Sequence, residues 1–308
     1  MIYWYISFAA ALVLSPLLFG IINKVKAFFA GRKGPSFFQL YYDIFKLLKK
    51  DAVYSQTAGI LLKSAPCISL MATVAAGLFL PFGMRLSPAS FCGDIFFFFY
   101  LLGTARFVTV LGALDTGSSF EGMGASREVQ FSALAEAAVF GCLGFLVLLT
   151  GKFSLAEMLT GAELAVENGH LTSVLLVAFA FFIILLSENC RVPFDDPDTH
   201  LELTMIHEAM ILDYGGPDLA IIFYGAALKL YLFASLLVML ILPATVGASF
   251  CGVLFTVAGV FVVAVLVGIV ESCMARFRFL KVPQMLMGAL GAALLAMVCL
   301  LVFEKGVC

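Results

Sequence analysis

The sequence contains few charged residues. Of its 308 residues only 12% are Asp, Glu, Lys or Arg, whereas 63% are hydrophobic. A soluble domain is about 25% charged and about 45–50% apolar, so this composition excludes an ordinary soluble protein. The chain is better measured in membrane spans of roughly 20 residues each.

Paired cysteines and catalytic signatures are also absent. None of the eight cysteines belongs to a Cys-x-x-Cys pair, which argues against an iron–sulfur cluster or a structural zinc site in this chain. There is no nucleotide-binding loop, no Ser/His/Asp arrangement and no His-Glu-x-x-His motif. We therefore expect no complete catalytic centre, no metal and no bound cofactor in this chain, and no nucleic-acid partner.

The first residues, MIYWYISFAA, lack the basic region and the cleavage site of a signal peptide, so we expect them to remain as a membrane span.

The alternation of apolar and polar residues that is typical of membrane barrels is missing. What the sequence has instead is long apolar segments, whose backbones must pair their polar groups internally in lipid. The predicted fold is an all-α polytopic membrane protein with about eight transmembrane helices, at residues 3–22, 64–83, 94–114, 129–150, 171–187, 218–242, 248–270 and 285–303.

Basic residues are divided unequally between the two sides of this predicted bundle. Thirteen of the eighteen Lys and Arg residues fall in the loops of one side and three in the loops of the other. Because cytoplasmic loops are enriched in Lys and Arg, both termini are predicted to lie outside, with the chain crossing a prokaryotic cytoplasmic (inner) membrane several times.

Residues 35–50, PSFFQLYYDIFKLLKK, are too few to span a bilayer. Phe37, Leu40, Tyr41 and Ile44 recur at helical spacing, and the charged residues lie off that stripe, so an amphipathic helix on the cytoplasmic-side membrane surface is predicted. We expect a single membrane domain over 1–308, with a cytoplasmic loop and interfacial helix at 23–63 and an acidic cytoplasmic-side loop and helix at 187–217.

A charge in the middle of a membrane span is costly and by default indicates function. Arg106 is such a charge and needs a partner, for which Asp115 near the end of the same span is a candidate. Glu128 and Glu136 are eight residues apart and share one face of the fourth helix. Glu136, inside the span, is a candidate for exchanging protons, and the alternative is a structural ion pair.

The stretch 187–217 gathers seven of the twenty acidic residues and two of the three histidines. Glu188 and Arg191 have the spacing of an ion pair on one helix. Pro193 and Pro197 interrupt that helix, and Thr199 begins a capping-box pattern for a new helix that runs to about residue 213. The ionisable groups from this stretch that we assign to a proton path are Glu188, Asp195, Asp198, His200, Glu202, His207, Glu208 and Asp213.

Histidine titrates near neutral pH, so these groups favour a hydrogen-bonded proton relay. A zinc site is the weaker interpretation, because His200 and His207 with Glu208 form a thin ligand set. Lys229 lies inside the sixth span, and Glu271, which ends the seventh, either extends the carboxylate set or pairs with the arginines that follow. Structural ion pairs are expected to involve Arg106, Asp115, Arg191, Lys229 and Glu271.

Three motifs resemble one family in order and spacing. They are GRKGPSFFQLYYDIFKLLKK, LDTGSSFEGMGASREVQFSALAE and Glu-x-x-Arg-x-Pro-Phe-Asp followed by a carboxylate-rich helix. The family is the proximal membrane subunit shared by respiratory complex I, the NADH:quinone oxidoreductase, and by the energy-converting membrane-bound nickel–iron hydrogenases, including formate hydrogenlyase. The resemblance covers nearly the whole chain, as far as VESCMARFRFL.

The resemblance implies a membrane anchor and coupling subunit of a multisubunit oxidoreductase, which links electron transfer in a peripheral arm to proton or sodium translocation. Arg32, Gly34, Pro35 and Asp43 match the loop that contacts the peripheral arm or a quinone-like cavity. By position, the acidic sites of the family's proton path correspond to Asp43, Glu128, Glu136, Glu188, Asp195, Asp198 and Glu202.

The implied partners are hydrogenase-like large and small subunits, a ferredoxin-like iron–sulfur subunit, antiporter-like membrane subunits and the lipid bilayer. Iron–sulfur clusters, and a nickel–iron centre where it is kept, would belong to those partners.

The short loop at 31–50 and the LDTGSSF run resemble the hydrogenase branch of the family, and two departures from the family pattern argue against a bound quinone. His200 stands where a carboxylate is usual, and Asp213-Tyr214 follows about three residues later than expected, in a region that lies beside the quinone cavity of complex I. The alternative is the quinone-site subunit of a complex I-type NADH dehydrogenase, with a quinone bound under residues 34–43. A stand-alone secondary transporter is a third possibility, but the two related halves that such folds often show are not visible.

Overall fold

The computed structural model describes residues 2–55, 58–82, 87–159, 170–195, 205–241 and 250–305. Within these ranges the chain is helical and contains no strand. Eight helices there are long and apolar enough to cross a membrane, which confirms the predicted all-α polytopic fold. They are α1 (Ile2–Phe29), α3 (Ile60–Phe79), α4 (Asp94–Asp115), α5 (Ser119–Thr150), α7 (Leu171–Glu188), α9 (Gly216–Ile241), α10 (Phe250–Cys273) and α11 (Val282–Lys305).

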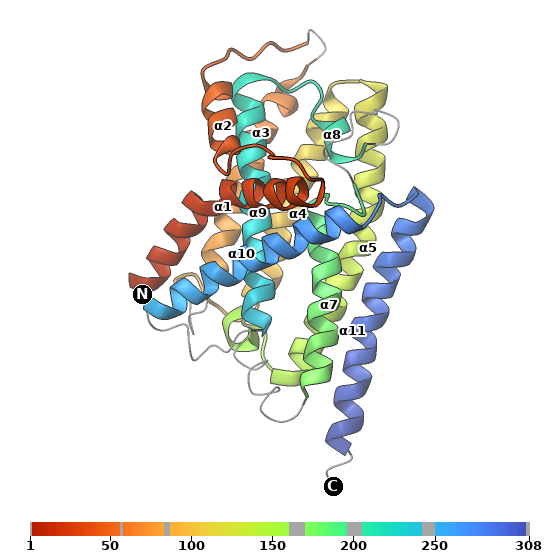
Figure 1. Cartoon of the computed structure of the whole chain (residues 1–308). Coiled ribbons are helices and arrows are strands. Elements are labelled where there is room, and N and C mark those ends of the chain that lie inside the picture. The colour runs from red at the N-terminus through yellow and green to blue at the C-terminus, as the bar shows by residue number, and fades with distance from the viewer. Residues whose placement is uncertain are drawn as a thin grey trace.

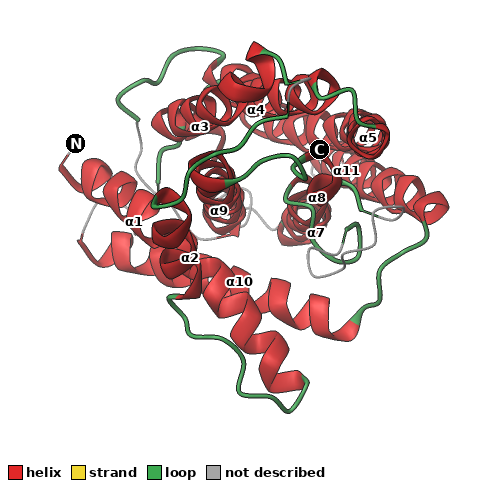
Figure 2. Cartoon of the chain, turned by 90° about the horizontal axis from the view of Figure 1, so that it is seen from above, coloured by secondary structure: helices red, strands yellow, loops and turns green. Residues whose placement is uncertain are grey.

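Two of these helices form the centre of the bundle. In α7 and α9, 61% of the residues of the most apolar window are buried, against 28–44% in the other six. α9 packs against α1, α3, α7 and α10, and α7 also packs against α5 and α11 (Figure 2). α10 crosses the bundle diagonally and lies against α1 (Figure 1). The side chains of α7 and α9 therefore face protein on most sides.

The short elements gather at one end of the molecule. α2 (Gln39–Leu48) and α8 (His207–Met210) lie at the top of Figure 1. Tyr54 Oη donates to Asp218 Oδ2 at 2.5 Å, which holds the segment after α2 against the start of α9. By the distribution of basic residues, this is the predicted cytoplasmic end. The 3-10 helix η2 (Phe279–Lys281) precedes α11.

Some helix bounds differ from those predicted. α1 continues to Phe29 and α5 begins at Ser119, because helical turns of polar residues extend beyond the apolar segment that marks a span. α2 falls within the predicted interfacial helix and exposes Tyr42, Phe45 and Leu48. The helix predicted from Thr199 to about residue 213 was too long: residues 196–204 lie outside the described ranges, and the rest of this segment is α-helical only at α8.

Candidate functional site

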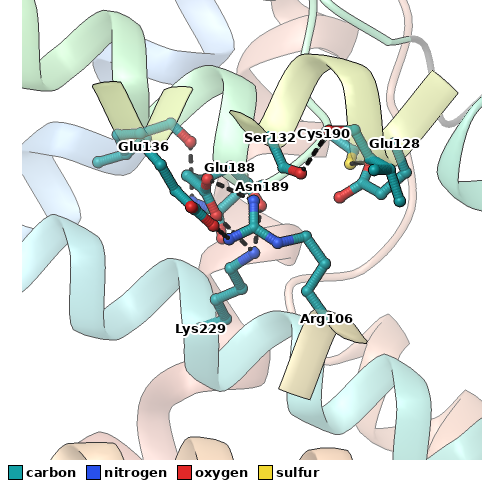
Figure 3. A network of polar contacts seen from close by, with 10 residues as sticks. Arg106, Glu128, Ser132, Glu136, Glu188, Asn189, Cys190 and Lys229 are labelled. Atoms are coloured by element: carbon teal, nitrogen blue, oxygen red, sulfur yellow. Dashed lines mark hydrogen bonds and ion pairs between the residues drawn. The ribbon is translucent and has the colours of Figure 1, made fainter. Parts of the chain in front are cut away.

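Glu188 is the centre of a buried ion-pair network (Figure 3). Its Oε1 accepts a hydrogen bond from Arg106 Nη1 at 2.9 Å, and its Oε2 lies 3.0 Å from Lys229 Nζ. Lys229 Nζ also donates to the backbone carbonyl of Glu188 at 2.6 Å. The side chain of Glu188 is only 4% exposed, so it joins α4, α7 and α9 inside the bundle.

The end of α7 places Glu188 at this junction. The helix stops at Glu188, and Cys190 takes a left-handed backbone conformation with φ of 49°. Asn189 Nδ2 donates back to the Leu185 carbonyl at 2.8 Å. The last carbonyls of a helix have no partner within it and attract cations, which is why the ammonium of Lys229 is well placed on the Glu188 carbonyl.

Arg106 connects Glu188 to Glu136. Its Nη2 lies 3.1 Å from Glu136 Oε1, while its Nη1 binds Glu188. The planar guanidinium fork suits such a two-carboxylate bridge. The Glu136 side chain, near the middle of α5, is 54% exposed, whereas that of Arg106 is 12% exposed. The network thus reaches from the interior to the flank of the bundle formed by α4 and α5.

The two basic and two acidic groups of this network balance, and Glu128 is left over. In the described part of the chain its side chain has one hydrogen-bond contact, from Cys190 Sγ to Oε2 at 3.8 Å. Burial raises the pKa of the Cys190 thiol well above its ordinary value, and the Glu128 carboxylate adds to this. Cys190 is therefore a neutral neighbour, and within the described ranges no basic side chain lies within ion-pair distance of Glu128.

Two cavities lie on either side of the Arg106–Glu188 pair. The first, of about 90 Å³, lies between α3, α4 and α9, and Glu128, His207 and Lys229 line it. The second, of about 50 Å³, is lined by aromatic residues of α4 and by Glu136. Because one water molecule needs roughly 10–15 Å³ of such space, each cavity has room for water.

His207 belongs to the wall of the first cavity because Asp195 holds its segment. Asp195 Oδ2 accepts the backbone N–H groups of Ile206 and His207, both at 3.1 Å, and Asp195 Oδ1 lies 2.9 Å from Arg276 Nη2. Burial lowers the pKa of His207 below its ordinary value, against an opposing effect of neighbouring Glu208 in α8. His207 is therefore neutral at pH 7 and can pass a proton through its ring.

Sequence reasoning missed Glu121. This side chain is fully buried in the first turn of α5; its Oε1 accepts the backbone N–H of Asp213 at 3.0 Å, and its Oε2 has no hydrogen-bond partner in the described ranges. It stands seven residues before Glu128 and so on the same helix face. That spacing was the signal that could have revealed it.

Two expected pairings, and one of the two alternatives for Glu271, were wrong. Asp115 is not the partner of Arg106 but accepts the backbone N–H of Leu62 at 3.1 Å. Arg191 does not pair with Glu188, because α7 ends there; instead, it binds Glu271 at 3.4 Å. Glu271 also lies 3.3 Å from Lys26 Nζ, so its partners come from α1 and the turn after α7, and not from the arginines that follow it.

The remaining predicted residues lie apart from the network. Arg32, Gly34 and Pro35 are exposed, and Asp43 accepts a hydrogen bond from Gln39 at 3.0 Å. None of these four residues lines the two cavities, so the structure does not bring the predicted quinone-like cavity together with the carboxylates. Asp198, His200 and Glu202 lie outside the described residues.

This fold and network define a polytopic membrane protein that carries paired charges and water-sized cavities inside its helix bundle. The chain belongs to the NADH dehydrogenase family, whose model matches residues 2–302. This confirms the family that the three motifs indicated.

Curated relatives include membrane-complex components from both branches of that resemblance. The chain is 33% identical to hydrogenase-4 component C of Escherichia coli, over 88% of this chain and 86% of the relative. It is 28% identical to formate hydrogenlyase subunit 4 of the same organism, over 93% and 94%. The NADH-ubiquinone oxidoreductase chain 1 of Triticum aestivum is 26% identical, over 74% and 72%. The chain is thus a membrane subunit of the kind found in hydrogenase and complex I-like oxidoreductases.

A solved structure shares the fold. A chain of the membrane-bound sulfane sulfur reductase, an archaeal respiratory membrane complex, superposes with a TM-score of 0.81 at 19% identity, covering 97% of this chain and 98% of that one. At this identity the likeness shows the fold alone.

Proposed function

We propose that this chain anchors the peripheral redox arm of a hydrogenase-type complex and couples electron transfer in that arm to proton or sodium translocation. The observation that carries the proposal is the chain of ionisable groups from His207 and Glu128, through Arg106 and Glu188, to Glu136, with a cavity on each side of the central pair. Among the three curated relatives, the components of hydrogenase-4 and formate hydrogenlyase are the more similar, which supports the hydrogenase branch.

Coupling follows from the closeness of the charges. Two unit charges about 4 Å apart interact by about 4 kcal/mol at an effective dielectric constant of about 20. A change of charge or shape at the cytoplasmic-end loops, for example on reduction of a cluster in the partner arm, would therefore change which carboxylate holds a proton if it displaced one member of this network. Since one pKa unit is about 1.4 kcal/mol, interactions of this size are large enough to load and release protons.

Two surfaces of the chain indicate which partner subunits it would contact. At the predicted cytoplasmic end, the exposed aromatic residues of α2 and the nearby lysines would receive hydrogenase-like large and small subunits and a ferredoxin-like subunit, which carry the iron–sulfur clusters and any nickel–iron centre. On the α4–α5 flank, Glu136 would face lipid if nothing covered it. Lipid cannot solvate a carboxylate, so an antiporter-like membrane subunit with polar groups is the neighbour that this flank fits.

The membrane location is proposed from charge. The loops at the end with α2 and α8 carry most of the basic residues, so that end faces the cytoplasm of a prokaryotic cell and both termini lie outside.

The test uses the whole complex, purified in mild detergent and placed in vesicles. Hydrogen evolution from reduced methyl viologen and acidification of the vesicle lumen would be measured for Glu188→Gln, Glu136→Gln and the control Glu157→Gln, whose side chain is 50% exposed and pairs with Lys152. We expect both network variants to lower ion movement per electron about tenfold, equal to about 1.4 kcal/mol, and the control to leave it unchanged. Wild-type coupling in both network variants would refute the proposal.

A further inference from the structure

The two cavities meet at only a few side chains. Leu102, Arg106 and Glu188 line both of them. Leu102 is apolar, and Glu188 is held at both its carboxylate and its carbonyl by Lys229. Arg106 is therefore the charged group at this boundary whose position can change.

We propose that the Arg106 guanidinium is the gate between the two cavities. It closes the passage while it bridges Glu188 and Glu136, and it opens the passage when its contact with Glu136 breaks. The inference rests on the proposed coupling function and adds the element that controls it.

A fixed positive charge in a narrow passage is a barrier to cations. An arginine in a pore excludes protons and metal cations by electrostatic repulsion. With Arg106 in its bridging position, a hydronium or sodium ion in the first cavity has to pass a guanidinium to reach Glu136. Ion movement between the cavities then needs a displacement of the arginine.

The two contacts that Arg106 makes in this bridge differ in strength. The Nη1–Oε1 contact to Glu188 is 2.9 Å long and buried, whereas the Nη2–Oε1 contact to Glu136 is 3.1 Å long and reaches an exposed carboxylate. The contact to Glu136 is therefore longer and less enclosed by this chain than the contact to Glu188, so it is the contact that opens. When Glu136 accepts a proton, it loses the negative charge that attracts Arg106 Nη2.

Glu128 provides a second carboxylate that the Arg106 guanidinium can bind once it has left Glu136. It lines the first cavity together with Arg106, and its side-chain contact in the described ranges is to a thiol and not to a basic group. Figure 3 shows Glu128 and Glu136 to either side of the Arg106 side chain, with Lys229 below the guanidinium. The charged groups that face Arg106 are thus Glu188 from α7, Glu136 and Glu128 from α5, and Lys229 from α9.

The experiment measures passive proton flux with no electron donor present. Vesicles that contain the purified complex receive an imposed potassium diffusion potential, and a trapped pH dye reports the lumen. Arg106→Gln should raise the flux about tenfold, because the charge barrier is lost. Lys152→Gln is the control: it also removes a positive charge, but from an exposed side chain that belongs neither to the network nor to the lining of either cavity, so the passive flux of these vesicles should equal that of wild type.

Arg106→Lys keeps the charge but cannot bind both carboxylates with a planar fork. The passive proton flux of Arg106→Lys should stay at the wild-type level. During turnover this variant should move about tenfold fewer ions per electron. It also tests the gate if Arg106→Gln does not assemble. A passive flux in Arg106→Gln equal to that of wild type, an equally raised flux in Lys152→Gln, or wild-type coupling in Arg106→Lys would each overturn the gate. If Glu136→Gln and Glu188→Gln lose ion movement while the arginine variants behave as wild type, the gate alone fails and the coupling function stands.

Discussion

Arg191 and Glu271 form a buried ion pair although 80 residues separate them in the sequence. Arg191 Nη1 lies 3.4 Å from Glu271 Oε1, and the guanidinium stacks 4.1 Å from the centre of the Phe19 ring. With Lys26 on the other carboxylate oxygen, this pair ties α1 and α10 to the turn after α7. It lines neither of the two cavities, which indicates a structural role.

Glu271→Gln should therefore lower stability without changing coupling. The substitution leaves a buried arginine without its counter-charge, which typically costs about 3–5 kcal/mol. The midpoint of thermal unfolding of the purified complex should fall clearly, while ions moved per electron stay at the wild-type value. For comparison, Glu157→Gln breaks an exposed pair and should cost less than about 1 kcal/mol. A lowered ion-to-electron ratio in Glu271→Gln at unchanged stability would contradict this assignment.

The buried position of His207 makes stability depend on pH. Its pKa in the folded protein is lowered by burial, while the unfolded chain has the ordinary value of about 6.5. Above pH 6.5 both states are neutral at this residue and the contribution is constant. As the pH falls below 6.5, the unfolded state binds a proton that the folded state does not, so stability decreases.

The thermal midpoint of the complex should therefore fall between pH 7 and pH 5, and it should fall less in His207→Gln, which cannot take up the proton. The difference between the two proteins at each pH isolates the histidine from the many carboxylates. Parallel curves for the two would show that His207 is not the group responsible.

A close backbone contact positions the loop before α2. A Cβ atom at Gly20 would lie 2.0 Å from the Phe37 carbonyl oxygen, so Gly20→Ala has to move this loop away from α1. We expect a cost of about 1–3 kcal/mol and a lower yield of peripheral subunits that copurify with the chain. Gly288→Ala in α11, where nothing lies within 4 Å of the new atom, is the control and should copurify them normally. Equal yields would refute the docking role of this loop.

The spans and the acidic face of α5 were predictable, because both follow from local periodicity. A long apolar run marks a helix in lipid whatever it packs against, and residues seven or eight apart return to one face of a helix. Glu128 and Glu136 were found in this way, and Glu121 would have been found by extending the same count.

The pairing of charges was not predictable, because it depends on tertiary packing. Asp115 is nine residues after Arg106 on α4, which is two and a half turns and so the opposite face. The true partner, Glu188, is 82 residues away on α7. Arg191 turns toward α10 because the backbone at Cys190 leaves the helical conformation, a change that no spacing rule indicates.

The exposed carboxylate of Glu136 has a consequence for biogenesis. A copy of this chain that is inserted before its neighbour is made would present an acidic group to acyl chains in the middle of a helix. Such an orphan copy would be a substrate for membrane proteases, so cells that use this protein should synthesise it in step with the membrane subunit that we propose for the α4–α5 flank.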